Sequence, residues 1–187
     1  HSRSRTKTVY FVYSGEVMLY NLTKHGNRKV IFILGKGQLL NQSIVSKKPN
    51  ALFCEAACPV QILEIAEEPF LHLMEQSHDL TRAVLREYER NLWRMGHQLK
   101  NTTGNMQMER KIAAKLWKLG RDFGVDTEDG VMIDIDLTIT LMADLVGAPR
   151  ENVSRACKVL TDRGLIRYGN KRFILTDSDG LAEFYKM

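Results

Sequence analysis

Cysteine is scarce in this chain, and long apolar runs are missing from it. Three cysteines in 187 residues are a low, odd number, which fits a reducing compartment better than a secreted disulfide framework. No apolar stretch approaches the roughly 20 residues that a membrane-spanning helix needs. We therefore expect a cytoplasmic protein without a membrane segment.

Patterns typical of metal ligands are also missing. The five histidines are scattered and form no H-x-H pair. Cys54 and Cys58 form a C-x₃-C pair, which an extended strand would separate by roughly 13 Å at about 3.3 Å per residue. That distance is too long for a disulfide or a shared metal ion. We therefore expect no metal or iron–sulfur site, and we predict that these two cysteines pack in the core.

The net charge is +5, but its distribution is more informative than its size. Residues 107–187 carry as many acidic as basic side chains, whereas the basic residues within 150–172 face only Glu151 and Asp162. A neutral region with one basic strip is typical of a nucleic-acid-binding surface, since phosphates need cations on one face. The strip consists of Arg150, Arg155, Lys158, Arg163, Arg167, Lys171 and Arg172.

Residues 8–66 alternate short apolar runs with turn signals. Regular short strands separated by glycine-containing turns predict an antiparallel β-roll. The chain begins with a polar tail and then a strand, so we expect it to enter the roll part-way, as an N-terminally truncated version. The predicted strands lie within residues 8–22, 24–34, 35–40 and 51–66.

From about residue 70 the apolar spacing becomes helical. A single amphipathic helix packed on the roll would explain an apolar face. The regular steps of three and four residues favour a partner helix instead, most simply the same helix of a second subunit. Residues 102–105 interrupt the pattern and predict a hinge. The seam consists of Leu85, Tyr88, Leu92, Met95, Leu99, Thr102 and Met106.

These patterns divide the chain into three parts. We predict a β-roll over residues 1–78, a dimerisation helix with its hinge over 79–105, and a DNA-binding domain over 106–187. The fold class is therefore α+β. The third part opens with a predicted helix over 110–121 and a strand over 131–137.

Residues 138–160 have the pattern of a helix-turn-helix. Thr138 is a plausible N-cap, and Gly147 permits a positive φ in the turn. Ala143 is small enough to let the second helix approach, and Val153 lies beneath both helices. Pro149 suits the first turn of the second helix, where its missing N–H costs nothing.

The second helix has two different faces. Arginine can bond guanine bidentately and glutamate can accept from cytosine N4, whereas a carboxylate would only repel phosphates. Glu151 therefore favours a base-reading helix over a solvated basic one. Val153, Ala156, Cys157 and Leu160 point inward; Arg150, Glu151, Ser154, Arg155 and Lys158 point outward.

A hairpin around Gly169-Asn170 follows and predicts a wing. Its basic residues flank the tip, where they could reach the sugar-phosphate backbone, although a solvated hairpin would look the same. The expected backbone contacts are Thr138, Thr140, Lys158, Lys171 and Arg172.

The order of roll, long helix, hinge and winged helix-turn-helix resembles the CRP/FNR family of bacterial transcription regulators over nearly the whole chain. RENVSR at 150–155 is similar to the family pattern R-E-x-V-x-R, and Ser154 matches a base-contacting serine of the FNR branch. The resemblance implies that Arg150, Glu151 and Arg155 contact bases, and that the roll over residues 1–78 senses an effector. It also implies a homodimer on double-stranded DNA at a palindromic TGTGA-like site, no enzymatic activity, and RNA polymerase as a further partner.

The resemblance disfavours cyclic AMP as the effector. Members that bind it carry Gly-Glu and Arg-Ser pairs in the roll, where this chain has Asn41-Gln42 and Asn50-Ala51. A buried phosphate without a cation would be strongly penalised. The effector stays unknown, and its expected pocket comprises Asn41, Gln42, Asn50, Ala51 and Met95.

Two other function classes remain. A constitutive DNA-binding regulator with a degenerate, ligand-free sensor would need no small molecule. A cupin-like oxygenase would share the roll, but the missing H-x-H pair and the helix-turn-helix both argue against it.

Overall fold

The computed structural model describes residues 7–186 except 25, 42, 47, 104 and 105, and of residues 99–103 it describes the backbone only. The chain divides into two compact units, residues 1–26 with 30–100 and residues 101–187 with 27–29. The finer boundaries after residues 78 and 105 stay predictions.

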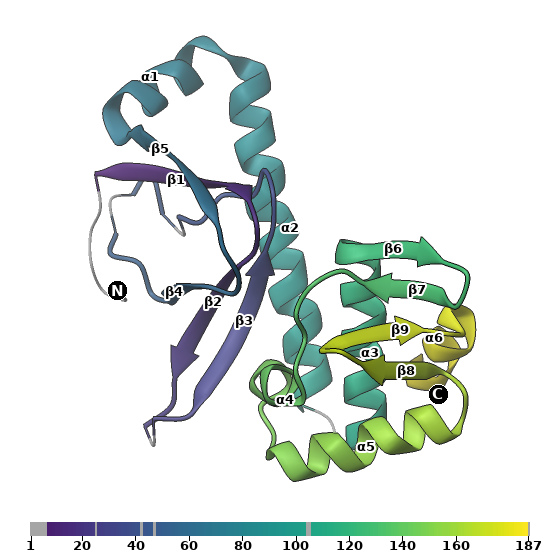
Figure 1. The fold of residues 1–187 in the computed structure, drawn as a ribbon. Helices are drawn as coiled ribbons and strands as arrows, with labels where there is room; N and C mark the ends of the chain where they lie inside the picture. Colours follow the sequence, from purple (N-terminus) through teal and green to yellow (C-terminus); the bar gives the residue numbers. More distant parts are fainter. Residues whose placement is uncertain (1–6, 25, 42, 47, 104–105, 187) are drawn as a thin grey trace. The chain divides into compact units, whose positions relative to one another are not determined.

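The first unit is built on two small sheets (Figure 1). β1 pairs antiparallel with β5, with Val9 opposite Ile65 and Phe11 opposite Leu63. β2 lies between β3 and β4 in the other sheet and is antiparallel to β4. The predicted antiparallel roll is therefore confirmed. Its strands are β1 (Thr8–Ser14), β2 (Val17–Leu22), β3 (Arg28–Leu34), β4 (Phe53–Ala56) and β5 (Gln61–Ala66).

The strand predicted within residues 35–40 is wrong, because this segment forms a turn. Gly37 has a φ of +80°, a conformation that glycine adopts without steric cost. The backbone N–H of Gly35 donates to Oε1 of Gln38 at 2.8 Å. Leu39 meets Phe11 through an isolated bridge. Backbone hydrogen bonds still join the segment to β1, since the Val12 N–H donates to the Gln38 carbonyl at 3.0 Å and the Leu40 N–H donates to the Tyr10 carbonyl at 2.9 Å.

Apolar side chains fill the first unit in two clusters. One lies within the strands and contains Val12, Leu19 and Leu34. The other joins the roll to the helices through Phe70 of α1 (Glu67–Gln76) and Val84 of α2 (His78–Thr103). Burial of such side chains, worth roughly 1.5–3 kcal/mol each, holds both helices on the roll.

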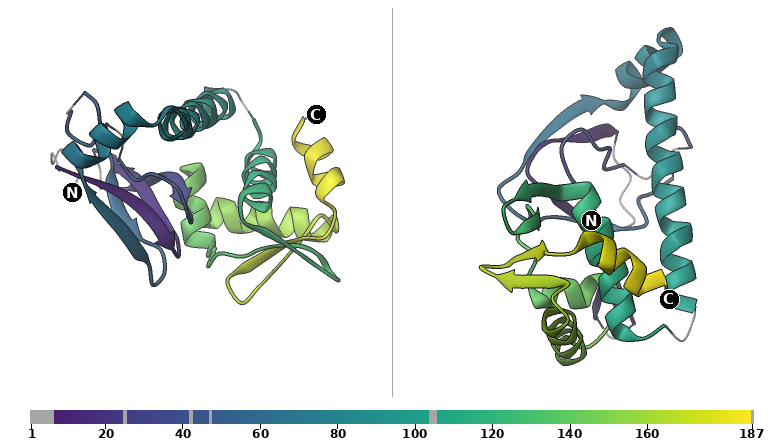
Figure 2. Two further views of the ribbon diagram at one scale, coloured as in Figure 1. Left: turned by 90° about the horizontal axis from the view of Figure 1, so that it is seen from above. Right: turned by 90° about the vertical axis from the view of Figure 1, so that its right-hand side faces the viewer.

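α2 is one uninterrupted helix of 26 residues (Figure 2). The predicted hinge at residues 102–105 is wrong in its first half, because Thr102 and Thr103 complete the helix. Gly104 and Asn105 lie outside the described residues. α3 then begins at Met108.

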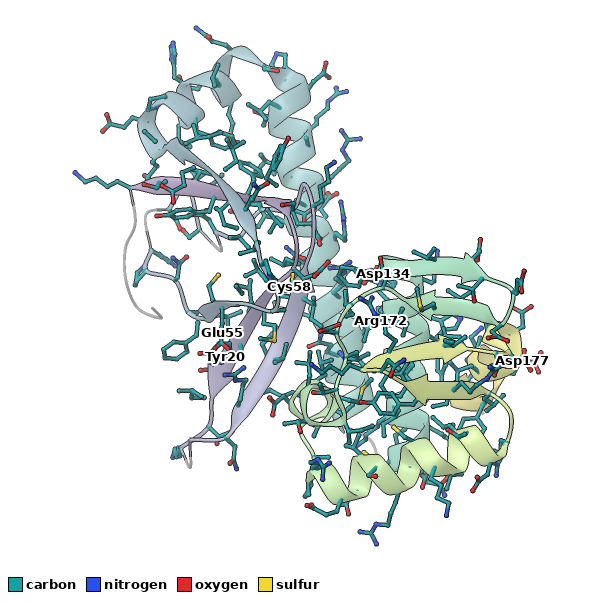
Figure 3. The ribbon with its side chains drawn as sticks, viewed as in Figure 1. Tyr20, Glu55, Cys58, Asp134, Arg172 and Asp177 are labelled. Atoms are coloured by element: carbon teal, nitrogen blue, oxygen red, sulfur yellow. The ribbon has the colours of Figure 1, made fainter. Side chains whose placement is uncertain are left out.

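The two cysteines of the roll do not pack as predicted. Cys54 is exposed, and Cys58 is half-buried. The Cys58 thiol (labelled in Figure 3) donates to Oε2 of Glu16 at 2.9 Å and accepts from the Glu16 backbone N–H at 3.3 Å. Cys58 therefore hydrogen-bonds to Glu16 instead of packing in the core. Cys54 does not pack in the core because its side chain is exposed.

The second unit is a four-stranded antiparallel sheet with helices around it. Its strand order is β6-β7-β9-β8, and α3 contacts both α5 and α6. β6 and α6 are absent from the sequence prediction, and the strand predicted at 131–137 ends at Ile133. The elements are α3 (Met108–Phe123), β6 (Gly124–Thr127), β7 (Gly130–Ile133), α4 (Ile139–Val146), α5 (Arg150–Asp162), β8 (Ile166–Gly169), β9 (Arg172–Leu175) and α6 (Ser178–Lys186).

Candidate DNA-binding site

The turn between α4 and α5 has the predicted geometry. Oγ1 of Thr138 accepts a hydrogen bond from the Leu141 N–H at 3.0 Å and so caps α4. Gly147 ends that helix with a φ of +72°, and its N–H donates to the Ala143 carbonyl at 2.7 Å. Pro149 lies at the N-cap of α5, one position before the predicted first turn. These local features fix the direction in which α5 leaves the turn.

The inner face of α5 is fully buried, as the helical spacing predicts. Val153 and Leu160 are 0% exposed, Ala156 is 1% exposed and Cys157 is 5% exposed. This face packs on α3 and α4. Removing one such aliphatic side chain would cost about 2–5 kcal/mol, so the helix cannot easily rotate.

Burial on this face gives a prediction about cysteine reactivity. We expect iodoacetamide to alkylate Cys54 and to spare Cys157 at neutral pH. Burial raises the pKa of both thiols, but Cys54 is exposed to the reagent. Cys157 is only 5% exposed and its pKa is raised to about 11, so its thiol stays protonated and unreactive at neutral pH. Peptide mass spectrometry after brief alkylation checks this. Equal rates at the two cysteines would contradict the buried face.

The outer face of α5 presents the predicted polar residues to solvent. Arg155 is steadied by its neighbour Asn152, since Nη2 of Arg155 donates to Oδ1 of Asn152 at 2.6 Å. An amide is neutral, so the guanidinium keeps its charge and its other N–H donors. Sequence reasoning missed Asn152, although its i,i+3 spacing from Arg155 was a usable signal. The exposed residues are Arg150, Glu151, Ser154, Arg155 and Lys158.

The start of α4 offers two hydroxyl groups. The cap uses the Thr138 oxygen as an acceptor, which leaves the O–H proton available to a phosphate oxygen. Thr140 is exposed on the first turn. Both positions are therefore compatible with the predicted backbone contacts.

The hairpin of β8 and β9 forms the predicted wing. Asn170 and Lys171 at its tip have φ values of 50° and 60°, as in a two-residue type I′ turn. The Lys171 carbonyl accepts from the Leu137 N–H at 2.7 Å. This bond ties the wing tip to the loop that precedes α4, while the Lys171 side chain stays exposed.

The predicted basic strip is wrong at the wing. Arg172 is ion-paired with Asp134 and, at 3.6 Å, with Asp136; Figure 3 labels Arg172 and Asp134. Arg167 pairs with Asp129 at 3.0 Å. These aspartates precede the strip in sequence and reach it only because β7 pairs with β9. The strip therefore carries its unneutralised charge on α5 and at Lys171, rather than along the whole hairpin.

The predicted effector residues have different surroundings in the first unit. Asn41 is 7% exposed, and its amide is bonded to β1: Oδ1 accepts from the Tyr10 N–H at 2.7 Å, and Nδ2 donates to the Thr8 carbonyl at 2.9 Å. Asn50 is half-buried, Ala51 and Met95 are exposed, and Gln42 lies outside the described residues. Asn41 thus holds the strand in place.

The predicted seam on α2 is largely solvent-exposed. Leu85 is 55% exposed, Leu92 is 68% exposed and Met95 is 43% exposed. Tyr88 instead packs on its own roll and donates to the Asn41 carbonyl at 3.3 Å, and burial raises its pKa to about 12. The side chain of Leu99 lies outside the described residues. An apolar stripe open to water on a helix is typical of an interface.

Metal-binding clusters and membrane-spanning helices are both absent from the residues that the structure describes. Among those residues, no cluster of three or more histidine, cysteine, aspartate or glutamate side chains could hold a metal ion. No described helix is long and apolar enough to cross a membrane.

Sequence comparison finds similar families for both units. A model of the Crp-like helix-turn-helix domain matches residues 110–184, and one of the cyclic nucleotide-binding domain matches residues 1–77. The CRP-like cAMP-activated global transcriptional regulator of Mycobacterium tuberculosis is 25% identical over 175 residues, or 93% of this chain and 78% of that protein. The global nitrogen regulator of Synechocystis sp. is 24% identical over 178 residues, or 94% and 79% of the two chains.

Solved structures show the same fold. FixK2 from Bradyrhizobium japonicum superposes with a TM-score of 0.83 at 18% identity, covering 97% of this chain and 89% of that one. A CRP/FNR-family transcriptional regulator from Thermus thermophilus gives 0.77 at 22% identity, covering 99% and 89%. The predicted fold class, a cyclic-nucleotide-binding-like roll followed by a winged helix-turn-helix, is confirmed.

Proposed function

Because the chain belongs to the CRP/FNR family of bacterial transcription regulators, we propose that it acts as a homodimer on a palindromic, TGTGA-like DNA site. The observation that carries this proposal is the division of α5 into a fully buried face and an exposed face with the sequence RENVSR. A helix anchored in this way can present its polar side chains to a major groove.

The outer face of α5 has the chemistry for reading bases. Arg150 and Arg155 can each bond O6 and N7 of a guanine, and Glu151 can accept from a cytosine N4. Ser154 lies between them and can donate or accept. Each good bidentate pair is worth about 1–3 kcal/mol of discrimination against the wrong base.

Contacts to the DNA backbone would position α5. We assign them to Thr138, Thr140, Lys158 and Lys171, which offer hydroxyl donors or cations to phosphate oxygens. Arg172 is a weaker candidate, because reaching a phosphate would require it to leave Asp134 and Asp136. Its ion pairs better support a role in holding the wing against the loop before α4.

A second copy of the chain would complete the site. The exposed seam of α2 supplies an apolar surface for pairing with the same helix in a partner. A symmetric dimer presents two α5 helices, and their separation should approach one turn of DNA, about 34 Å. The target would therefore be an inverted repeat.

We propose that the regulating signal is something other than cyclic AMP. The mycobacterial relative is named as cAMP-activated, but this chain has the neutral Asn50 where the family resemblance places an arginine. Asn41, in the other expected contact, is already bonded to β1. A cyclic phosphate would lack its counter-charge there. A constitutive regulator with a ligand-free roll remains the second candidate.

We further propose that the protein is cytoplasmic and has no catalytic activity of its own. RNA polymerase is the expected further partner, since the named relatives are transcriptional regulators.

Competition binding tests the proposal. Fluorescence anisotropy would compare a palindromic TGTGA duplex with a scrambled duplex of equal length and composition, at one fixed salt concentration. We expect at least about a 10³-fold preference for the palindrome. Equal affinity would contradict sequence-specific binding. Repeating the assay after exhaustive dialysis distinguishes the two candidates, because undiminished binding favours the constitutive one.

Lys171→Ala tests the backbone contacts separately from base reading. We expect weaker binding to the specific and the scrambled duplex alike, because a phosphate contact is independent of sequence. The slope of log K against log salt concentration should fall by about one per contact removed. Titrations at several salt concentrations measure it, and an unchanged slope would remove Lys171 from the contacts.

A further inference from the structure

Four arginines follow one another along α2 at intervals of four residues. Arg82, Arg86, Arg90 and Arg94 share one slowly turning face of the helix at this spacing. The row begins at the exposed Arg82 and ends at Arg94, which is only 9% exposed. Arginine is rarely buried to this extent. The helix therefore carries positive charge from solvent into the first unit.

A cavity of about 370 Å³ lies between the middle of this row and the roll. Arg86 and Arg90 line it, and its apolar lining comes from Phe11, Leu39, Leu80 and Val84. Its volume falls within the range of small-molecule sites, which combine apolar walls with a few polar groups. We call it the α2 cavity. It contains none of the residues that the family resemblance assigns to the effector.

One acidic side chain lines the cavity and is already occupied. Glu87 is 8% exposed. Its Oε2 accepts from Nη2 of Arg90 at 2.9 Å, and its Oε1 accepts from Nε2 of Gln38 at 3.1 Å. Glu87 therefore fixes Arg90 and offsets one of the two guanidinium charges. The Nε of Arg86 donates to the Arg82 carbonyl at 3.4 Å. Because Glu87 offsets only one of the two arginine charges, the cavity lining has a net positive charge.

We propose that the α2 cavity binds a small organic anion, with one carboxylate beside an apolar body. The carboxylate would pair with the guanidinium of Arg86, whose planar fork matches it. The apolar body would lie against Phe11, Leu39 and Leu80. The cavity is open to solvent beside the exposed Arg86 and Arg90, and its volume and its one buried glutamate favour a small molecule over a protein surface. An effect of the bound anion on DNA affinity, transmitted through the dimer helix, rests on the proposed function. Binding of the anion to the cavity does not.

Benzoate is a suitable probe, because it joins a carboxylate to an apolar ring. Titration of the full chain, followed by ¹H–¹⁵N NMR or calorimetry, is expected to show saturable binding with a dissociation constant of about 1 mM. Arg86→Gln should weaken it at least about tenfold. Arg82→Gln removes the same charge from the same helix outside the cavity and should leave it unchanged. Ala83 also lines the cavity, so Ala83→Leu would fill it without changing charge and should abolish benzoate binding.

The lack of saturable benzoate binding up to about 20 mM would overturn the proposal. Equal weakening of benzoate binding by Arg82→Gln and Arg86→Gln would also overturn it. Tight binding of neutral benzyl alcohol would likewise overturn the anion requirement. Measuring operator binding on the same samples separates the two hypotheses. A protein that binds operator but not benzoate contradicts only the cavity, and one that binds benzoate but no operator contradicts only the proposed function.

Discussion

Arg155→Ala is expected to weaken binding to the proposed palindromic site by roughly 30-fold to 20,000-fold. Each bidentate base contact is worth about 1–3 kcal/mol, and a symmetric dimer would lose it in both half-sites, which doubles the free energy. Binding to scrambled DNA should change little, because phosphate contacts dominate there. Arg155 is exposed, so its removal should leave folding intact. Anisotropy titrations with both duplexes measure the difference.

Arg163→Ala is the matched control for this variant. Arg163 follows the last residue of α5, and its guanidinium lies over the Phe184 ring at 4.9 Å. Its replacement removes one positive charge close to the same helix, but away from the proposed base-reading residues. We expect a small loss that is equal on both duplexes. If Arg155→Ala gave the same uniform loss, Arg155 would be a general electrostatic contact and not a base reader.

Leu92→Glu is expected to convert the proposed dimer into monomers. Leu92 is 68% exposed within the subunit, so glutamate there should not disturb the fold. In the proposed dimer it would bring two carboxylates together at a seam that otherwise buries leucine. A monomer also loses the effective-concentration advantage of two linked half-sites, about 10²–10⁴-fold in affinity. Sedimentation velocity and operator titration measure the two effects.

Trp93→Glu controls for the loss of any exposed apolar residue from α2. Trp93 is 58% exposed and packs against His97 with the ring centroids 3.9 Å apart. It lies about 100° further around the helix than Leu92, away from the seam. The dimer should therefore survive this change. Dissociation by both variants, or by neither, would contradict the proposed interface.

The DNA-binding helix was predictable because its determinants are local. The helical period alone places Val153 and Leu160 on the face opposite Arg150 and Arg155. Gly147 predicts the turn because glycine readily adopts a positive φ. Burial of the inner face then follows from a few consecutive turns. The structure confirms which positions of this helix are buried and which are exposed.

The electrostatics of the wing were not predictable in the same way. Arg172 meets Asp134 because β9 pairs with β7, and that pairing depends on the whole sheet. A charge count within residues 150–172 therefore overestimates the cations available to DNA. The register between paired strands determines which charged side chains meet across the sheet. A short segment of sequence does not reveal that register.

The roll shows the same limit in its interior. Asn41 looks like a ligand-contact position from its place in the family pattern, but its amide is bonded to the backbone of β1. The C-x₃-C spacing predicts that Cys54 packs in the core, but its side chain is exposed. The α2 cavity was equally hidden, because it needs Phe11 and Leu39 beside Arg86 and Arg90, from distant parts of the sequence.

Selection of binding sites from random duplex DNA is the most direct test of sequence-specific recognition by α5. The purified full chain would be taken through several rounds at fixed salt, without any assumed target. We predict enrichment of an inverted repeat whose half-site centres lie about 34 Å, or roughly 10–10.5 base pairs, apart, and loss of that enrichment in Arg155→Ala. A bound pool that stays random would contradict the account, as would an enriched motif that Arg155→Ala selects equally well.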